Sequence, residues 1–398
     1  MHPVRTLRYP SPVNRAKLFY FLYYGATAAL SPFLTLYYQS LGLSGTQIGL
    51  LAGLVPLTSM VSGTLWNAAA DATRRYRAIL LTATGGAWLA TLLVSRAGGL
   101  AALLPTVLLM AAFSAPIGTL VDSSVANQTR KTGGDYGRVR LWGSVGWGMG
   151  ALLAGPVIDR YGLIWAFVIH LTLLAGVFAV SLRVPLDHSV AEPGTSFFSR
   201  LRVLLAERAY LTLLVVALVF GMSLSMALSY LFLHMQNLGA SETLMSVTLI
   251  TATLSEVPFM FLSGRLIRRF GVRPIIAAAL VLMAARTFAY AFMPAAGWAV
   301  AINLLHGPTY ATLWAASVSE SNRLAPPGLG ATAQSALTSA MFGLGSALGS
   351  FSGGILYDRA GAPFMFQCAG WLLLATAGFW LVASRRPTAD RRRRTADR

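Results

Sequence analysis

Apolar stretches of about twenty residues recur along nearly the whole chain, and no other feature of the sequence restricts the fold as strongly. A helix of that length, rising about 1.5 Å per residue, crosses a hydrocarbon layer about 30 Å thick. Of the 398 residues, 56% are hydrophobic and only 11% are charged, whereas about 25% of the residues in a soluble domain are charged. The chain is therefore expected to be an all-α membrane protein.

Hydropathy predicts twelve membrane spans, which makes a twelve-helix protein with both ends on one side of the membrane. The expected spans are residues 17–38, 45–69, 77–95, 100–126, 139–158, 162–182, 209–236, 243–267, 274–293, 297–320, 330–356 and 363–384. The longest polar stretch, residues 183–208, falls between the sixth and seventh spans and contains Pro185, Pro193 and Gly194. We therefore expect a six-helix bundle at 1–182, a cytoplasmic linker at 183–208, a second bundle at 209–384 and a basic cytoplasmic tail at 385–398.

The formal net charge of +18 is distributed by loop rather than gathered on one surface. With the N-terminus in the cytoplasm, the outer loops contain only Arg96, Arg160 and Arg359, and the remaining basic residues between the spans fall on the inner side. This distribution follows the positive-inside rule and predicts an inner-membrane protein with cytoplasmic termini. Since basic segments beside a membrane helix are attracted to anionic lipids, we expect lipids as partners and no nucleic acid.

The two halves of the chain repeat each other. Gln39-Ser-Leu-Gly42-Leu-Ser44 recurs 197 residues later from Gln236, Ser62-Gly63 recurs 201 residues later from Ser263, and the Gly155–Gly162 segment recurs 199 residues later from Gly354. Such duplication is typical of secondary transporters, whose two repeats move around a central substrate site. Small residues, which permit close helix packing, concentrate on the fifth and eleventh spans: Gly143, Gly146, Gly148, Gly150, Gly155, Gly343, Gly345, Gly349, Gly353 and Gly354.

A few ionisable residues lie inside the expected spans. They are Asp122, Arg140, His170, Glu256, Arg286 and His306. A charge in hydrocarbon costs at least about 2.5 kcal/mol, so each is a candidate functional residue. His170 has no charged neighbour in the sequence and is expected to be a packed histidine.

Arg140, Ser144 and Trp147 are spaced so that one helix face carries all three. A guanidinium, a hydroxyl and an indole ring together suit a sugar or another ring-bearing polar solute. In the alternative interpretation, Arg140 is an anchor at the membrane surface and Trp147 faces lipid. Asp122 favours the binding site, because it would need a basic partner and Arg140 lies on the next span.

Glu256, Arg286 and His306 lie on three consecutive expected spans of the second half. An acid, a permanent cation and a group that titrates near neutral pH could together bind and release a proton. Glu256 is expected to change protonation when helix movement alters its distance from Arg286. The alternative is a static buried triad.

These segments resemble the major facilitator superfamily, in particular the branch of lactose permease-like and nucleoside/proton symporters. The resemblance rests on Val121-Asp-Ser-Ser-Val followed by Tyr136-Gly-Arg-Val-Arg140-Leu-Trp-Gly-Ser-Val-Gly-Trp147, and on the spacing of Arg286 and His306. It implies two pseudo-symmetric six-helix bundles. It also implies sugar-site roles for Asp122, Arg140, Trp147 and Glu256, and roles in both proton coupling and sugar contact for Arg286 and His306.

The loop after the second span also resembles that superfamily, through Asn67-Ala-Ala-Ala-Asp71-Ala-Thr-Arg74-Arg75. The resemblance implies a gating role for Asp71, Arg74 and Arg75. The chain departs from the permease pattern at Thr309, where the proton-carrying glutamate is expected, and at Phe342, near an expected lysine. By elimination, Glu256 becomes the leading proton carrier and Asp122 the second.

The sequence thus predicts a monomeric secondary transporter that moves a small polar solute, sugar-like or nucleoside-like, by proton-coupled symport and alternating access. The alternatives are a proton-coupled exporter of drugs or metabolites and a uniporter. No cofactor and no metal site are expected, since the sequence contains no metal-ligand cluster, nucleophile elbow or phosphate loop. An enzyme or a scaffold is therefore disfavoured.

Overall fold

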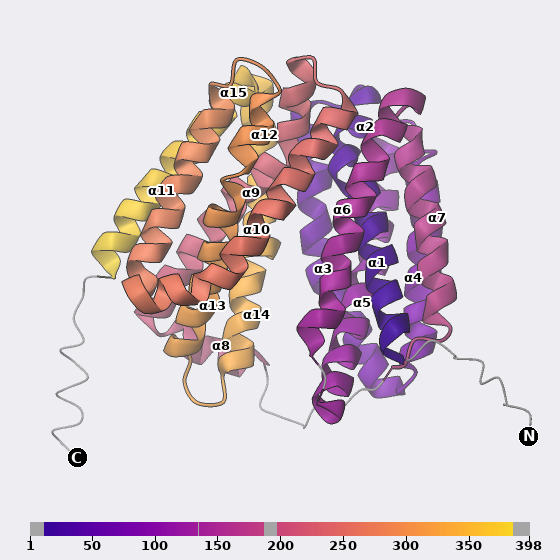
Figure 1. Cartoon of the computed structure of the whole chain (residues 1–398), viewed down its shortest axis with the longest axis horizontal. Helices are drawn as coiled ribbons and strands as arrows, with labels where there is room; N and C mark the ends of the chain where they lie inside the picture. Colours follow the sequence, from indigo (N-terminus) through magenta and orange to yellow (C-terminus); the bar gives the residue numbers. More distant parts are fainter. Residues whose placement is uncertain (1–11, 134, 187–196, 385–398) are drawn as a thin grey trace, which may run out of the picture. The chain divides into compact units, whose positions relative to one another are not determined.

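The computed structural model describes residues 12–133, 135–186 and 197–384, and those residues form helices joined by short turns (Figure 1). The helical elements are α1 Pro12–Leu30, η1 Ser31–Phe33, α2 Leu34–Ser40, α3 Gly45–Thr73, α4 Tyr76–Val94, α5 Leu100–Thr132, α6 Tyr136–Tyr161, α7 Ile164–Ser181, α8 Phe197–Leu205, α9 Arg208–Asn237, α10 Glu242–Phe270, α11 Val272–Ala291, α12 Trp298–Asn303, η2 Gly307–Ala311, α13 Thr312–Leu324, α14 Gly330–Thr338, η3 Ser339–Gly345 and α15 Ser346–Ala383.

Nine helical stretches in the described part of the chain are long and apolar enough to cross a membrane. The last of them, residues 330–383, contains two expected spans, because the backbone leaves the helical conformation at Ala360 and Gly361. The first and tenth expected spans are each divided into shorter helical pieces. Pro32 and Pro308 lie at these interruptions and have no backbone N–H to continue the helical hydrogen bonds. The twelve expected spans thus all fall on helical segments.

Helix ends coincide with residues suited to capping. Ser44 and Gln47 form a capping box at the start of α3. The Asp135 carboxylate accepts hydrogen bonds from the Gly137 and Arg138 amides at 2.8 and 3.4 Å and so begins α6. Gly133 ends α5 with a φ of 67°, a conformation that glycine adopts without strain.

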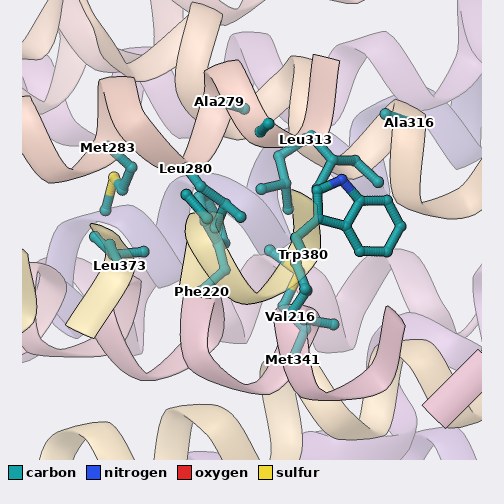
Figure 2. Close-up of a cluster of buried hydrophobic side chains, with 14 of the residues drawn as sticks. Val216, Phe220, Ala279, Leu280, Met283, Leu313, Ala316, Met341, Leu373 and Trp380 are labelled. Atoms are coloured by element: carbon teal, nitrogen blue, oxygen red, sulfur yellow. The ribbon is translucent and has the colours of Figure 1, made fainter. Parts of the chain in front are cut away.

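The chain divides into two compact units. Unit 1 comprises residues 1–193 and 232–250, and unit 2 comprises residues 194–231 and 251–398. Buried apolar side chains of α1, α4, α5 and α7 form the core of unit 1. In unit 2, the core includes Phe220 from α9, Leu280 from α11, Leu313 from α13 and Trp380 from α15 (Figure 2). The division at 182, 208 and 384 remains a prediction.

Glycines bring particular helices into backbone contact. A methyl group at Gly146 would overlap the carbonyl oxygen of Phe21, so α6 crosses α1 at van der Waals distance. The residue 199 positions later, Gly345, would meet the carbonyl oxygen of Leu218 at 2.6 Å if it carried a Cβ. The duplicated glycines therefore pack the equivalent helix pair in each half.

The start of α10 packs against the end of α6 within unit 1. The Thr243 hydroxyl donates to Asp159 Oδ2 at 2.7 Å, and a Cβ at Gly155 would overlap the Ser246 hydroxyl. These contacts explain why residues 232–250 group with unit 1.

A short helix, α8, lies inside the expected linker, where the sequence analysis predicted none. Leu204 of this helix is buried with Tyr210, Ala333 and Ala336 in a small apolar cluster. Residues 187–196 of the linker and the whole predicted tail, including Arg391–Arg394, lie outside the described residues.

Candidate functional site

Unit 1 contains one polar cluster centred on Asp122 of α5. Its Oδ1 atom accepts hydrogen bonds from the hydroxyls of Tyr20 at 2.7 Å and Tyr136 at 3.1 Å, and it lies 3.7 Å from Nε of Arg140. Helices α1, α5 and α6 therefore meet at this carboxylate. The predicted pairing of Asp122 and Arg140 is present, and about a third of each side chain is exposed, 34% and 32% respectively.

The Arg140 guanidinium lies against aromatic rings. Its central carbon is 4.0 Å from the centroid of the Tyr24 ring and 5.5 Å from that of Tyr20. Gly143 leaves room for this stacking, because a Cβ there would lie 2.5 Å from Arg140 Nη1 and 2.8 Å from the Tyr24 ring. The stacked rings stabilise the cation from its faces and leave its N–H edges available.

In the described part of the chain, no hydrogen bond is made by Asp122 Oδ2 or by the Nη atoms of Arg140. The Asp122–Arg140 pair therefore offers a ligand one hydrogen-bond acceptor, Asp122 Oδ2, and several donors, the N–H groups on the Arg140 Nη atoms. Ser144 is exposed and Trp147 is half-buried, and neither is hydrogen-bonded to Asp122 or Arg140 among the described residues. The structure therefore joins the acid and the base, and it does not add Ser144 and Trp147 to their contacts.

Three tyrosines, Tyr20, Tyr24 and Tyr136, belong to this cluster although sequence analysis did not select them. Tyr20 and Tyr24 lie one helical turn apart in α1, on the face turned to Asp122 and Arg140. The available signal was the aromatic run Phe19-Tyr-Phe-Leu-Tyr-Tyr24 in the first span. Hydropathy hides such residues, because a tyrosine ring counts as apolar while its hydroxyl does not.

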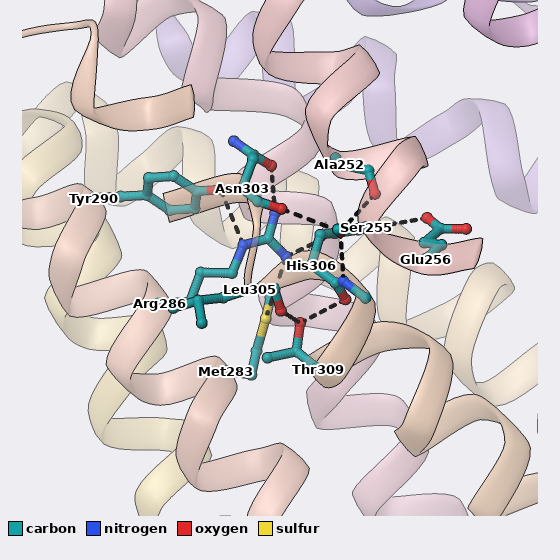
Figure 3. Close-up of polar contacts among 11 residues, drawn as sticks. Ala252, Ser255, Glu256, Met283, Arg286, Tyr290, Asn303, Leu305, His306 and Thr309 are labelled. Carbon is teal, nitrogen blue, oxygen red and sulfur yellow. Dashed lines mark hydrogen bonds and ion pairs between the residues drawn. The ribbon is translucent and has the colours of Figure 1, made fainter. Parts of the chain in front are cut away.

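Unit 2 contains a second cluster, which joins α10, α11 and the tenth span (Figure 3). Arg286 Nη1 lies 2.7 Å from Nδ1 of His306, and Nε2 of the same imidazole lies 2.8 Å from Oε1 of Glu256. A guanidinium can only donate hydrogen bonds, so Nδ1 of His306 is the acceptor and carries no proton. Nε2 therefore carries the proton and donates to Glu256, and this fixes the neutral tautomer of His306.

Arg286 is buried, with 3% of its surface exposed. Its Nε atom donates to the Tyr290 hydroxyl at 3.0 Å, and Nη2 donates to Oδ1 of Asn303 at 2.8 Å. Its hydrogen-bond partners in the described part of the chain are thus neutral groups, and the His306 imidazole contacts both Arg286 and Glu256. The expectation that Glu256 changes protonation with its distance from Arg286 stays a prediction.

The two departures from the permease pattern, Thr309 and Phe342, make contacts with neutral groups. The Thr309 hydroxyl donates to the backbone carbonyls of Leu305 and His306, at 2.7 and 2.9 Å. Phe342 packs its ring against Tyr310 and Trp314. Neither position adds a titratable group to the cluster.

The expected gating residues lie at the end of α3 and in the turn before α4, outside both clusters. Oδ1 of Asp71 accepts a hydrogen bond from the Tyr76 hydroxyl at 2.9 Å. Arg74 ends α3 in the left-handed conformation with a φ of 59°, and Arg75 precedes α4. All three residues are exposed, and their gating role stays a prediction.

Known proteins are similar to this chain in sequence and in fold. The MFS_1 like family matches residues 13–368. A maltose permease of Geobacillus stearothermophilus is 33% identical over 353 residues, which cover 88% of this chain and 89% of the permease. A probable 3-phenylpropionic acid transporter of Escherichia coli is 26% identical over 304 residues, 73% of this chain and 77% of the transporter. The crystal structure of nucleoside transporter NupG has a TM-score of 0.79 and 16% identity, covering 94% of this chain and 97% of that one.

Proposed function

Because the chain belongs to the MFS_1 like family of major facilitator superfamily transporters, we propose that it carries a small, neutral, hydroxylated solute across the inner membrane together with protons. It is a multi-pass membrane transporter rather than an enzyme. The proposal concerns the solute, the coupling ion and the orientation. Both termini would be cytoplasmic, and the transport cycle would proceed by alternating access.

One observation carries the choice of solute. Asp122 Oδ2 and the Arg140 Nη atoms have no hydrogen-bond partner among the described residues, while tyrosine rings surround them. A sugar or a nucleoside ribose offers neighbouring hydroxyls, of which one can donate to the carboxylate and another can accept from the guanidinium. The rings supply flat apolar surfaces for the carbon face of the solute.

Charge balance favours a neutral solute over an anionic one. Asp122 and Arg140 together carry no formal net charge, so a neutral hydroxylated solute adds no uncompensated charge to the cluster. An aromatic acid such as 3-phenylpropionic acid, after which the Escherichia coli relative is named, would bring a second carboxylate close to Asp122. Like charges at such distances repel, and this repulsion disfavours binding of the acid.

The second cluster provides the coupling group. Glu256 is 23% exposed, more than the 11% of His306, and its carboxylate can take up a proton while His306 keeps its own on Nε2. Protonation would remove the negative charge that balances buried Arg286. The protonated and deprotonated forms of the cluster therefore have different formal charges, which a transport cycle can use. Asp122 is the alternative carrier, and a uniporter is the alternative if neither acid titrates during transport.

Uptake into proteoliposomes tests the solute class. We expect radiolabelled maltose or uridine to enter vesicles that hold the purified protein, and labelled 3-phenylpropionate to be excluded. Asp122→Asn should abolish uptake, because an amide replaces an acceptor oxygen of the carboxylate. Asp135→Asn is the matched control, since Asp135 caps α6, asparagine caps equally well, and the ion pair of Asp135 with Arg138 is exposed. Uptake of 3-phenylpropionate alone would contradict the neutral solute, and full uptake by Asp122→Asn would contradict the site.

A further inference from the structure

The tenth span is interrupted beside the second cluster, which contains Glu256, Arg286 and His306. Helix α12 ends at Asn303, residues 304–305 form a turn, and η2 from Gly307 to Ala311 has the wider π-helical winding. Pro308 contributes to the break, because it has no N–H to donate. π-Helical turns inside helices occur frequently at functional sites.

A side chain from another helix enters this break. The Ser255 hydroxyl of α10 accepts a hydrogen bond from the Gly307 amide at 2.9 Å and lies 3.3 Å from the Asn303 carbonyl oxygen. In a regular α-helix, that amide and that carbonyl, four residues apart, would bond each other. Ser255 therefore lies between a donor and an acceptor that belong to one helical turn, an insertion that is known to kink helices.

Gly307 makes this insertion possible. A Cβ at position 307 would overlap the Ser255 carbonyl oxygen and lie 3.0 Å from the Glu256 amide nitrogen. The backbones of α10 and the tenth span are thus in contact at the residues that precede and include the proposed proton carrier.

The inserted hydroxyl is flanked by the residues that hold Arg286 and Glu256. Asn303, on one side of the break, accepts from Arg286, and His306, on the other side, accepts from Arg286 and donates to Glu256. One helical residue corresponds to a rotation of about 100°. The winding of residues 303–307 therefore decides whether the side chains of Asn303 and His306 can both reach the Arg286 guanidinium.

We propose that Ser255 is a positioning residue for the proton switch. Its hydroxyl keeps the tenth span open between Asn303 and Gly307, so that His306 presents Nδ1 to Arg286 and Nε2 to Glu256. The proposal rests on the proposed coupling role of Glu256 and His306. Without the hydroxyl, Gly307 can donate to the Asn303 carbonyl instead, and this closes the turn and rotates His306 away from one of its two partners.

The first test reads the tautomer of His306 directly and needs no solute. Protein labelled with ¹⁵N-histidine is studied in lipid by magic-angle-spinning NMR, with His306→Gln to assign the signal. The wild type should show a neutral ring with the proton on Nε2. The groups that face this ring are Glu256 from α10, Arg286 from α11, and Tyr310, stacked on it at 5.3 Å. Tyr290 reaches it through Arg286.

Ser255→Ala should give a mixture of tautomers, and Ser255→Thr, which keeps the hydroxyl, should restore the wild-type signal. Ser263→Ala is the matched control, because the Ser263 hydroxyl also bonds the carbonyl three residues earlier in α10, as that of Ser255 does. It should leave His306 unchanged. A wild-type His306 signal in Ser255→Ala would overturn the proposal. If Ser255→Ala cannot be purified, Gly307→Ala should displace Ser255 and produce the same mixture.

The second test measures transport of radiolabelled maltose in proteoliposomes. Ser255→Ala should reduce accumulation driven by a pH gradient about tenfold, while exchange without a gradient and uptake by Ser263→Ala stay near wild type. Equal loss of exchange and accumulation would assign Ser255 to general folding and overturn the positioning role. If the wild type shows no response to a pH gradient, the proposed coupling fails, and the NMR result still decides whether Ser255 sets the tautomer of His306.

Discussion

At the residue scale, the orientation of the Asp122 carboxylate depends on hydrogen bonds as well as on its ion pair with Arg140. Two tyrosine hydroxyls donate to the same oxygen that faces Arg140, and the hydrogen bonds are shorter than the 3.7 Å ion-pair distance. The tyrosines therefore orient the carboxylate, and Arg140 balances its charge. This arrangement leaves Oδ2 and the guanidinium edge for a ligand.

Tyr20→Phe removes the shorter of these hydrogen bonds while it keeps the ring. We expect affinity for radiolabelled maltose or uridine to fall between about fivefold and about a hundredfold, because a charged acceptor loses a donor. Tyr37→Phe is the control, since Tyr37 donates to the Val94 backbone in the same unit and has no contact with Asp122. Equal affinity in Tyr20→Phe and wild type, measured by scintillation proximity, would remove Tyr20 from the site.

Sequence reasoning found the charged residues of both clusters and missed their neutral partners. Asp122, Arg140, Glu256, Arg286 and His306 stand out because a charge inside an apolar span is costly. Tyr20, Asn303 and Ser255 carry no charge, and their importance comes from contacts between helices far apart in the sequence. Periodicity within a single helix does not contain that information, and even the aromatic run around Tyr20 does not show which ring contacts Asp122.

At the element scale, the expectation of an all-helical membrane fold is confirmed in the described residues, and the interruptions within the expected spans are what hydropathy missed. An average over about nineteen residues smooths the break at Pro32 and the π-helical turn at Pro308. It also overlooks α8, which has nine residues and lies in a polar stretch. Short amphipathic helices and local winding depend on single residues and on partners in other helices.

Gly146→Ala tests the backbone contact between α1 and α6. The added methyl group would overlap the Phe21 carbonyl oxygen, so we expect a loss of about 1–3 kcal/mol of stability. Gly148→Ala is the control on the same helix, because a Cβ there would have no neighbour from another helix within 4 Å. It should be neutral or stabilising by up to about 1 kcal/mol, since alanine favours helix over glycine. Thermal unfolding in detergent compares the two, and equal melting temperatures would argue against the close contact.

At the scale of the whole molecule, the proposed orientation can be tested by thiol labelling. Cys368 is the only cysteine, and its replacement by serine gives a background without thiols. On this background, Gly98→Cys should react with a membrane-impermeant maleimide in intact cells, because it lies in an expected outer loop. Ala206→Cys, an exposed residue in the expected cytoplasmic linker, should react only after the cells are opened. The reverse pattern would invert the orientation and place the arginine-rich loops outside.

Coupling also belongs to the whole molecule, because it links proton binding to solute movement. Glu256→Gln cannot release a proton, and its amide can still accept a hydrogen bond from His306 Nε2. In proteoliposomes we expect this variant to exchange labelled for unlabelled solute at a rate near wild type, since exchange requires only alternating access. Accumulation driven by a pH gradient should be lost, because no proton is bound or released in the cycle.

Glu242→Gln is the control for Glu256→Gln, because Glu242 is an acidic residue at the start of the same helix. Loss of both activities would place Glu256 in the solute site, and retained accumulation would pass the carrier role to Asp122, whose hydrogen-bonded carboxylate is the other acid in the two clusters.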